Sequence, residues 1–222
     1  MSKVLLVIMS LLMTISAFAN IGENPYSTAK GKTLTYDNYY DGDKIGKATI
    51  KINESSITYN NKFHIRAYLV FTYDYKAKVT ISFDESGVTL VKSKTNDDGD
   101  KFKFTIKGSG ENLTKGSKSV KAFKGLSLNF VFSKKMRAEL TSSWKSFKIL
   151  DVERGKTSSF KQKSAGTKTI KVKGKKYNVF GVRWVKGVRK GLSYYDVNSG
   201  ILIKSDVTKG GNTLTLKIKS IK

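Results

Sequence analysis

Alternation of apolar and polar side chains is the dominant pattern along most of the chain. Phe102, Phe104 and Ile106 alternate with lysine and threonine, and Ile170 and Val172 do the same further on. Successive side chains of a β-strand point to opposite faces, so each such segment has one apolar and one polar face. This is typical of antiparallel sheets with one face in solvent, because strands of parallel sheets are apolar on both faces.

Residues that tolerate positive φ separate the alternating stretches, as expected for hairpin turns. The clearest are Asp41-Gly42, Asp98-Gly99 and Gly210-Gly211. Together these signals predict strands at residues 33–40, 44–52, 62–75, 79–84, 87–95, 101–107, 118–123, 125–132, 167–173, 176–186, 191–196, 201–208 and 212–220. A short helix of one or two turns is predicted only within Ser133 to Trp144.

The chain has no internal repeat and no Pro-rich linker, and its one proline precedes the first predicted strand. Residues 155–166 are rich in Lys, Ser and Gly and are predicted to form a flexible loop. The pattern therefore predicts a single all-β, largely antiparallel domain over residues 20–222. A division into two lobes near residues 145–165 is the alternative.

Residues Met1 to Ala19 have the features of a secretory signal peptide. Lys3 supplies a positive charge, Val4 to Ile15 are largely apolar, and Ala17-Phe18-Ala19 is a small-x-small cleavage motif. The apolar stretch is shorter than the roughly 20 residues that a membrane-spanning helix needs, and no second one follows. We therefore expect cleavage after Ala19, export to the periplasm or the exterior, and no transmembrane segment in the mature chain.

Charge is the most unusual feature of the composition. The 222 residues include 42 Lys and Arg against 17 Asp and Glu, a formal net charge of +25. Such a field attracts anions, and for an exported protein these would be anionic lipid, glycan or wall polymer. Only five of the basic residues are Arg, which argues against a specific phosphate site and against sequence-specific nucleic-acid binding. A compositional bias toward Lys at exposed strand positions is the alternative explanation.

The charge is concentrated in the second half of the chain, where no acidic residue occurs between Glu153 and Asp196. This interval contains the residues that we predict to bind anions: Lys168, Lys171, Lys173, Lys175, Lys176 and Arg183.

Aromatic side chains gather on a few predicted strands. Most of them are expected in the core. Four are candidates to line an apolar groove for an amphipathic ligand, namely Tyr73, Tyr75, Trp144 and Trp184.

The composition offers little support for catalysis. The chain has no Cys and a single His, His64, which lies within a predicted strand and outside any motif. The run from Asn96 to Asp100 lacks the ligand spacing of a calcium loop and is interpreted as a turn. We predict no catalytic residue, no metal site and no cofactor.

Several segments together resemble a group of exported bacterial proteins known only as domains of unknown function. The segment from Tyr36 to Gly46 resembles their first hairpin, which has a pattern like Y-x-V-x-Y-x-G-x-x-I-G. Further similarities are Tyr73-Asp74-Tyr75, Thr141 to Trp144, and Tyr194-Tyr195-Asp196. The resemblance implies one strongly curved sheet of long meandering strands, like a spiral β-roll or an open barrel, and it implies no reaction.

These observations predict an envelope protein that binds an anionic or amphipathic component without catalysis. One alternative is a hydrolase of an envelope polymer, for which Asp84, Asp151 and Asp196 are the candidate acids. That reaction needs two carboxylates roughly 5–10 Å apart across a groove. The other alternative is an assembly factor that binds another envelope protein through its sheet edges.

Overall fold

In the computed structural model, residues 26–67, 71–85, 87–109, 112–128 and 130–222 are described, and the predicted signal peptide lies outside them. Fourteen strands in these residues form one antiparallel sheet, with order β8-β7-β6-β5-β4-β3-β2-β1-β14-β13-β12-β11-β10-β9. The bounds are β1 Thr33–Tyr40, β2 Asp43–Ile52, β3 Ser56–Ala67, β4 Phe71–Asp84, β5 Gly87–Asp97, β6 Asp100–Ser109, β7 Asn112–Lys115, β8 Lys118–Ser119, β9 Lys145–Asp151, β10 Lys156–Val172, β11 Lys175–Lys186, β12 Arg189–Asp196, β13 Leu202–Lys209 and β14 Asn212–Ile221. One 3₁₀ turn (η1, Ser27–Ala29) precedes β1, and a short helix (α2, Lys134–Ala138) precedes β9.

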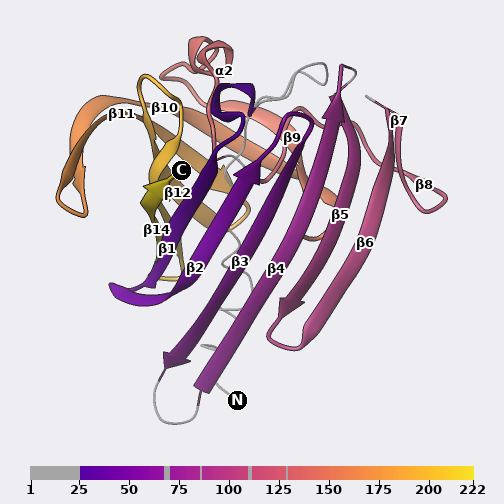
Figure 1. Ribbon diagram of the computed structural model, residues 1–222, viewed down its shortest axis with the longest axis horizontal. Helices are drawn as coiled ribbons and strands as arrows, with labels where there is room; N and C mark the ends of the chain where they lie inside the picture. Colours follow the sequence, from indigo (N-terminus) through magenta and orange to yellow (C-terminus); the bar gives the residue numbers. More distant parts are fainter. Residues whose placement is uncertain (1–25, 68–70, 86, 110–111, 129) are drawn as a thin grey trace.

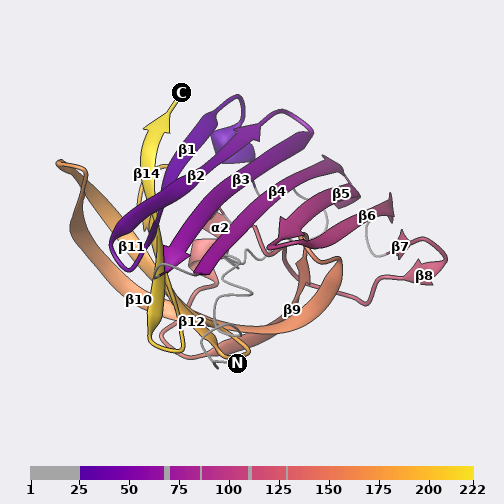
Figure 2. The same cartoon turned by 90° about the horizontal axis from the view of Figure 1, so that it is seen from below.

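The sheet consists of two meanders joined through the ends of the chain. β1 to β8 follow one another in space, β9 to β14 do the same, and β14 pairs with β1. Figure 1 shows β1–β6 in front of β9–β12, and Figure 2 shows the sheet curled into an open barrel. β8 and β9 end the strand order, and no ladder between described residues joins them. The predicted all-β, curved, antiparallel sheet is therefore confirmed.

The connection between the two meanders runs through the interior of the open barrel. Its apolar side chains are buried, from Phe123 to Phe132, and it touches the sheet through isolated bridges at Leu126 and Val131. The Phe130 ring lies 5.3 Å from that of Tyr36 and 5.5 Å from that of Tyr59. The apolar side chains of this segment therefore fill the space inside the curled sheet and form part of the core.

Four sequence predictions are wrong at the level of elements. The strands predicted at 118–123 and 125–132 correspond to the two-residue β8 and to the interior connection, which is buried on both sides. The strand predicted at 62–75 spans the end of β3 and the start of β4, which pair antiparallel. The loop predicted at 155–166 belongs to β10, where Phe160 and Gln162 supply the buried positions. The short helix predicted within 133–144 is confirmed by α2.

Gly191 on β12 leaves room for the largest buried side chain. It pairs with Trp184 on β11, and a Cβ atom at Gly191 would overlap the indole ring. We therefore expect Gly191→Ala to lower the free energy of unfolding by about 1–3 kcal/mol, because the ring is forced out of its packed position. Urea unfolding, with Trp184 fluorescence followed in a Trp144→Phe background, checks this. Unchanged stability and emission would contradict the packing described here.

Candidate functional site

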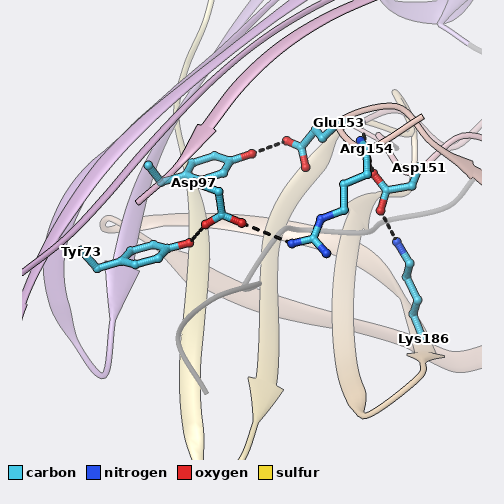
Figure 3. Close-up of polar contacts among 7 residues, drawn as sticks. Tyr73, Asp97, Asp151, Glu153, Arg154 and Lys186 are labelled. Atoms are coloured by element: carbon cyan, nitrogen blue, oxygen red, sulfur yellow. Dashed lines mark hydrogen bonds and ion pairs between the residues drawn. The ribbon is translucent and has the colours of Figure 1, made fainter. Parts of the chain in front are cut away.

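A cluster of charged side chains lies where the turn between β9 and β10 enters the interior (Figure 3). We call Asp97, Asp151, Glu153, Arg154, Lys186 and Arg189 the charged cluster. Asp97 ends β5, the next three residues belong to β9 and its following turn, and the last two lie on either side of the turn between β11 and β12. The cluster thus joins strands from the two meanders.

Glu153 connects the turn to β4 and β5. Its Oε1 accepts a hydrogen bond of 2.9 Å from the hydroxyl of Tyr75, and its carbonyl oxygen accepts one of 3.3 Å from Ser93 Oγ. Burial, and then the charge of Asp151, raise the pKa of Glu153 to about 8. The side chain is therefore mostly protonated at neutral pH.

Asp97 provides the second connection. Its carboxylate accepts a hydrogen bond from Tyr73 and one of 3.2 Å from Arg154 Nη2. Burial raises the pKa of Asp97 despite these two partners. The guanidinium of Arg154 also lies 5.7 Å from the centre of the Phe102 ring on β6. These contacts hold the β9–β10 turn against β4, β5 and β6, on the side where no ladder between described residues joins the two meanders.

Asp151 fixes the shape of the turn itself. Its Oδ1 accepts 3.1 Å hydrogen bonds from the backbone N–H groups of Glu153 and Arg154, and its Oδ2 lies 2.7 Å from Lys186 Nζ. Burial by itself raises the pKa of this carboxyl, but Lys186 and the two N–H groups lower it below its usual value. Asp151 is therefore ionised next to a protonated Glu153.

A pocket of about 460 Å³ opens beside the charged cluster. β10 pairs with β11 only from Lys161 onward, whereas its first residues pair only with β9, so the two strands separate at this point. The pocket is lined by Asp151, Arg154, Lys156, Thr157, Ser158, Ser159, Lys186, Gly187, Val188 and Arg189. We call it the basic pocket, because four of these side chains are cationic and only one is acidic.

The four cations of the basic pocket outnumber the two carboxylates that pair with them, since Asp151 pairs with Lys186 and Asp97 pairs with Arg154. Burial and the neighbouring charge of Arg154 lower the pKa of Arg189. Partial burial, together with Arg189 and Arg154, lowers the pKa of Lys209. Within the described residues, Arg154 Nε and Ser158 Oγ are buried and have no hydrogen-bond partner. The site therefore offers positive charge and hydrogen-bond donors to an anion.

The structure distributes the six residues predicted to bind anions over both faces of the sheet. All six predicted residues are exposed. The register pairs Lys171 with Lys176, whereas Lys168 lies one position out of phase and contacts the Tyr194 ring on the opposite face. Lys173 occupies the hairpin turn and pairs with Asp37 of β1. Alternation thus puts Lys168 and Lys171 on opposite faces, and whether the six residues bind anions stays a prediction.

The predicted apolar groove is not formed by its four aromatic residues. Tyr73, Tyr75 and Trp184 are buried in the core, where Trp184 stacks on Phe160 at 5.9 Å. Trp144 is 46% exposed and lies apart from them, before β9. Tyr73 and Tyr75 act instead as hydrogen-bond donors to the charged cluster.

The acids considered for hydrolysis are not brought together either. Asp196 accepts hydrogen bonds from the N–H groups of Asn198 and Ser199 and shapes its own turn. Asp84 ends β4, and only Asp151 lines the basic pocket. His64 faces Asp74 at 3.1 Å on the exposed side of β3 and β4.

Sequence reasoning missed Arg154, Glu153 and Arg189 as site residues. The available signal was the mixed-charge run from Asp151 to Arg154, of which the sequence analysis considered only Asp151. Counting Arg along the sequence also hid the fact that two of the five meet at one pocket.

Two further features of the described residues bear on the site. They contain no group of three or more His, Cys, Asp or Glu side chains arranged to hold a metal ion. None of their helices has the length and apolar character needed to cross a membrane.

Comparisons with known proteins identify relatives without an assigned activity. A family model described as a domain of unknown function, DUF6134, matches residues 36–219. A β-barrel-like protein of the domain of unknown function DUF1849 from Brucella abortus superposes with a TM-score of 0.63 at 11% identity, covering 87% of this chain and 98% of that one. The resemblance to bacterial proteins of unknown function is thus confirmed, and the fold is shared with a solved structure.

Two other solved structures superpose less closely. One is a putative exported protein with a YmcC-like fold from Bacteroides fragilis, with a TM-score of 0.39 at 9% identity, covering 93% of this chain and 99% of that one. The other is the hypothetical lipoprotein YmcC from Escherichia coli, with a TM-score of 0.33 at 10% identity, covering 90% and 89%. A search of curated proteins gave no match.

Proposed function

Because this chain belongs to the DUF6134 family, whose description assigns no activity, we propose a function from its site: non-enzymatic binding of an anionic component of the cell envelope. The single observation that carries the proposal is the basic pocket. Arg154, Lys156, Lys186 and Arg189 line it together with one carboxylate, that of Asp151. Lys186 pairs with Asp151, and Arg154 pairs with Asp97 on β5. A pocket with this excess of cations favours a phosphate or carboxylate group, and Arg is well suited to such oxyanions.

The rim of the pocket favours a ligand with an apolar part. Val188, in the turn between β11 and β12, is 75% exposed and also lines the pocket. An exposed aliphatic side chain beside Lys186 and Arg189 matches a molecule in which an anionic group adjoins a hydrocarbon chain. An anionic lipid has this chemistry, and the export predicted from residues 1–19 gives the protein access to it.

The pocket offers less to a hydrolase. Retaining or inverting hydrolysis needs two carboxylates that both reach the substrate. Asp151 lines the pocket. Glu153 does not line it, because its carboxyl group is buried and accepts a hydrogen bond from Tyr75. In this proposal, the protonated Glu153 and the ionised Asp151 hold the β9–β10 turn in place and do not act on a substrate.

Calorimetric titration with inorganic phosphate and with dihexanoyl phosphatidylglycerol below its micelle concentration tests the function. We expect Lys156→Gln/Arg189→Gln to weaken binding of both probes by about tenfold or more, because each charge-assisted hydrogen bond contributes roughly 1.5–3 kcal/mol. Val188→Ser should weaken binding of the lipid only.

The matched control is Lys161→Gln/Lys190→Gln, which removes the same charge from exposed positions of β10 and β12 outside the pocket. If the double variant fails to fold, Lys156→Gln alone replaces it in the test, because Lys156 is at an exposed position. Equal losses for pocket and control variants, or no binding of either probe by the wild type, would overturn the proposal.

A further inference from the structure

The solvent face of β2–β6 carries lysines in ordered rows. These five strands lie side by side at the front of Figure 1. The register places three consecutive rows of outward-facing residues across them. The first row is Lys47, Lys62, Lys76, Asn96 and Lys101. The second is Thr49, Asn60, Lys78, Lys94 and Lys103. The third is Lys51, Thr58, Thr80, Lys92 and Thr105.

Nine of these fifteen positions are lysine and none is acidic. We call the nine lysines the lysine ladder. All nine are exposed, and none forms an ion pair with any residue that the structure describes. Acids border the first row at both ends. Asp37 of β1 is the register partner of Lys47 and is held by Lys44 and Lys173. Asp98 and Asp100 lie in the turn beside Lys101, and Asp74 faces His64.

Four pairs of these lysines lie directly opposite each other on neighbouring strands. They are Lys47–Lys62, Lys62–Lys76, Lys78–Lys94 and Lys94–Lys103. Neighbouring strands are about 4.8 Å apart, and like charges in directly opposed positions destabilise a sheet. A general excess of lysine explains lysines on a polar face, but it does not explain why no acid interrupts them.

An anionic ligand that spans several strands relieves this repulsion. A groove of about 650 Å³ follows part of the first row. Five lysines line it, namely Lys44, Lys47, Lys62, Lys76 and Lys219, together with one acid, Asp37, which is already paired with Lys44 and Lys173. The large exposed apolar side chains of the described residues, Trp144, Val188 and Ile221, all lie outside the three rows. Surfaces that insert into bilayers combine basic with apolar side chains, so this face matches an extended polymer better than a membrane.

We propose that the lysine ladder binds an extended polyanion, a chain of repeated phosphate or carboxylate groups laid across β2–β6. The inference is independent of the basic pocket, since the two sites share no residue. In this proposal, a linear anionic polymer binds the outer face of the first meander, and a single anionic group binds in the basic pocket.

The test uses Lys62→Glu/Lys94→Glu, which converts all four like-charge pairs to opposite-charge pairs. We expect this variant to unfold at a higher temperature than the wild type and to bind linear inorganic polyphosphate about tenfold or more weakly at 0.1 M salt, with a shallower dependence of log affinity on log salt. The control, Lys118→Glu/Lys148→Glu, changes the net charge equally at exposed positions of β8 and β9 and should remain within about threefold of the wild type.

A Lys62→Glu/Lys94→Glu variant that is more stable but binds polyphosphate as tightly as the wild type would overturn the proposal. Equal losses in the control variant would also overturn it, because binding would then follow net charge alone. Vesicles of phosphatidylglycerol are the competing surface, and binding to them that depends on Lys62 and Lys94 as strongly as polyphosphate binding does would contradict the choice of a polymer.

Discussion

Glu153→Gln is expected to abolish most of the decrease in stability that the wild-type protein shows between about pH 5 and pH 8. The carboxyl group is buried and bonded to Tyr75, and its pKa is raised from 4.5 to about 8 in the folded protein. Between these two values the unfolded chain releases the proton while the folded chain keeps it. The free energy of unfolding therefore falls as pH rises through this window and levels off above pH 8.

The glutamine side chain imitates the protonated acid and still accepts the hydrogen bond of Tyr75. The variant and the wild type should therefore have similar stability near pH 4.5. Above pH 8 the variant should be more stable, by at most about 5 kcal/mol for a shift of this size. Urea unfolding at half-unit steps from pH 4.5 to pH 9 measures the difference. Parallel stability curves for the two proteins would show that Glu153 does not titrate in this window.

Phe130→Ala is expected to lower the free energy of unfolding by about 3–5 kcal/mol. Phe130 lies in the connection through the open barrel, where its ring contacts those of Tyr36 on β1 and Tyr59 on β3. Truncation leaves a cavity between the interior connection and the sheet. Few backbone hydrogen bonds join these two parts; examples run from Phe132 N to Gly200 O and from Leu202 N to Phe130 O.

The comparison variant is Trp144→Ala, which removes a larger ring from a side chain that is 46% exposed. Its effect should stay below about 1 kcal/mol. Chemical denaturation of both variants checks the pair. Similar small losses at the two positions would mean that the connection does not form part of the core.

Much of the fold could be predicted from the sequence because alternation and turn residues are local signals. The ends of β1, β13 and β14 lie close to their predicted bounds, where Asp41-Gly42 and Gly210-Gly211 mark the turns. The reversal between β3 and β4 was missed because no Gly, Pro or Asn occurs between Arg66 and Thr72. The interior connection was missed because apolar residues at alternate positions fit a strand equally well, and only the tertiary fold buries the residues between them.

The candidate site was harder to predict, since it depends on contacts between distant strands. Asp97 and Arg154 are 57 positions apart, and Tyr75 and Glu153 are 78 apart. Net charge counted along the chain also directed attention to the second half of the chain and away from the first. The first half has a net charge of only +3, but its acids lie mainly at turns while its lysines share the outer face of β2–β6.

Two-dimensional ¹H–¹⁵N spectra recorded during titration with inorganic phosphate test the central claim most directly. Anion binding in the basic pocket predicts saturable shifts of the backbone amides of residues 153–159 and 186–190, with amides of β13 and β14 unaffected. These shifts should disappear in Lys156→Gln/Arg189→Gln and persist in Lys161→Gln/Lys190→Gln. Small shifts spread over all exposed lysine-rich strands, without saturation and insensitive to the pocket substitutions, would contradict the assignment of the pocket as the anion site.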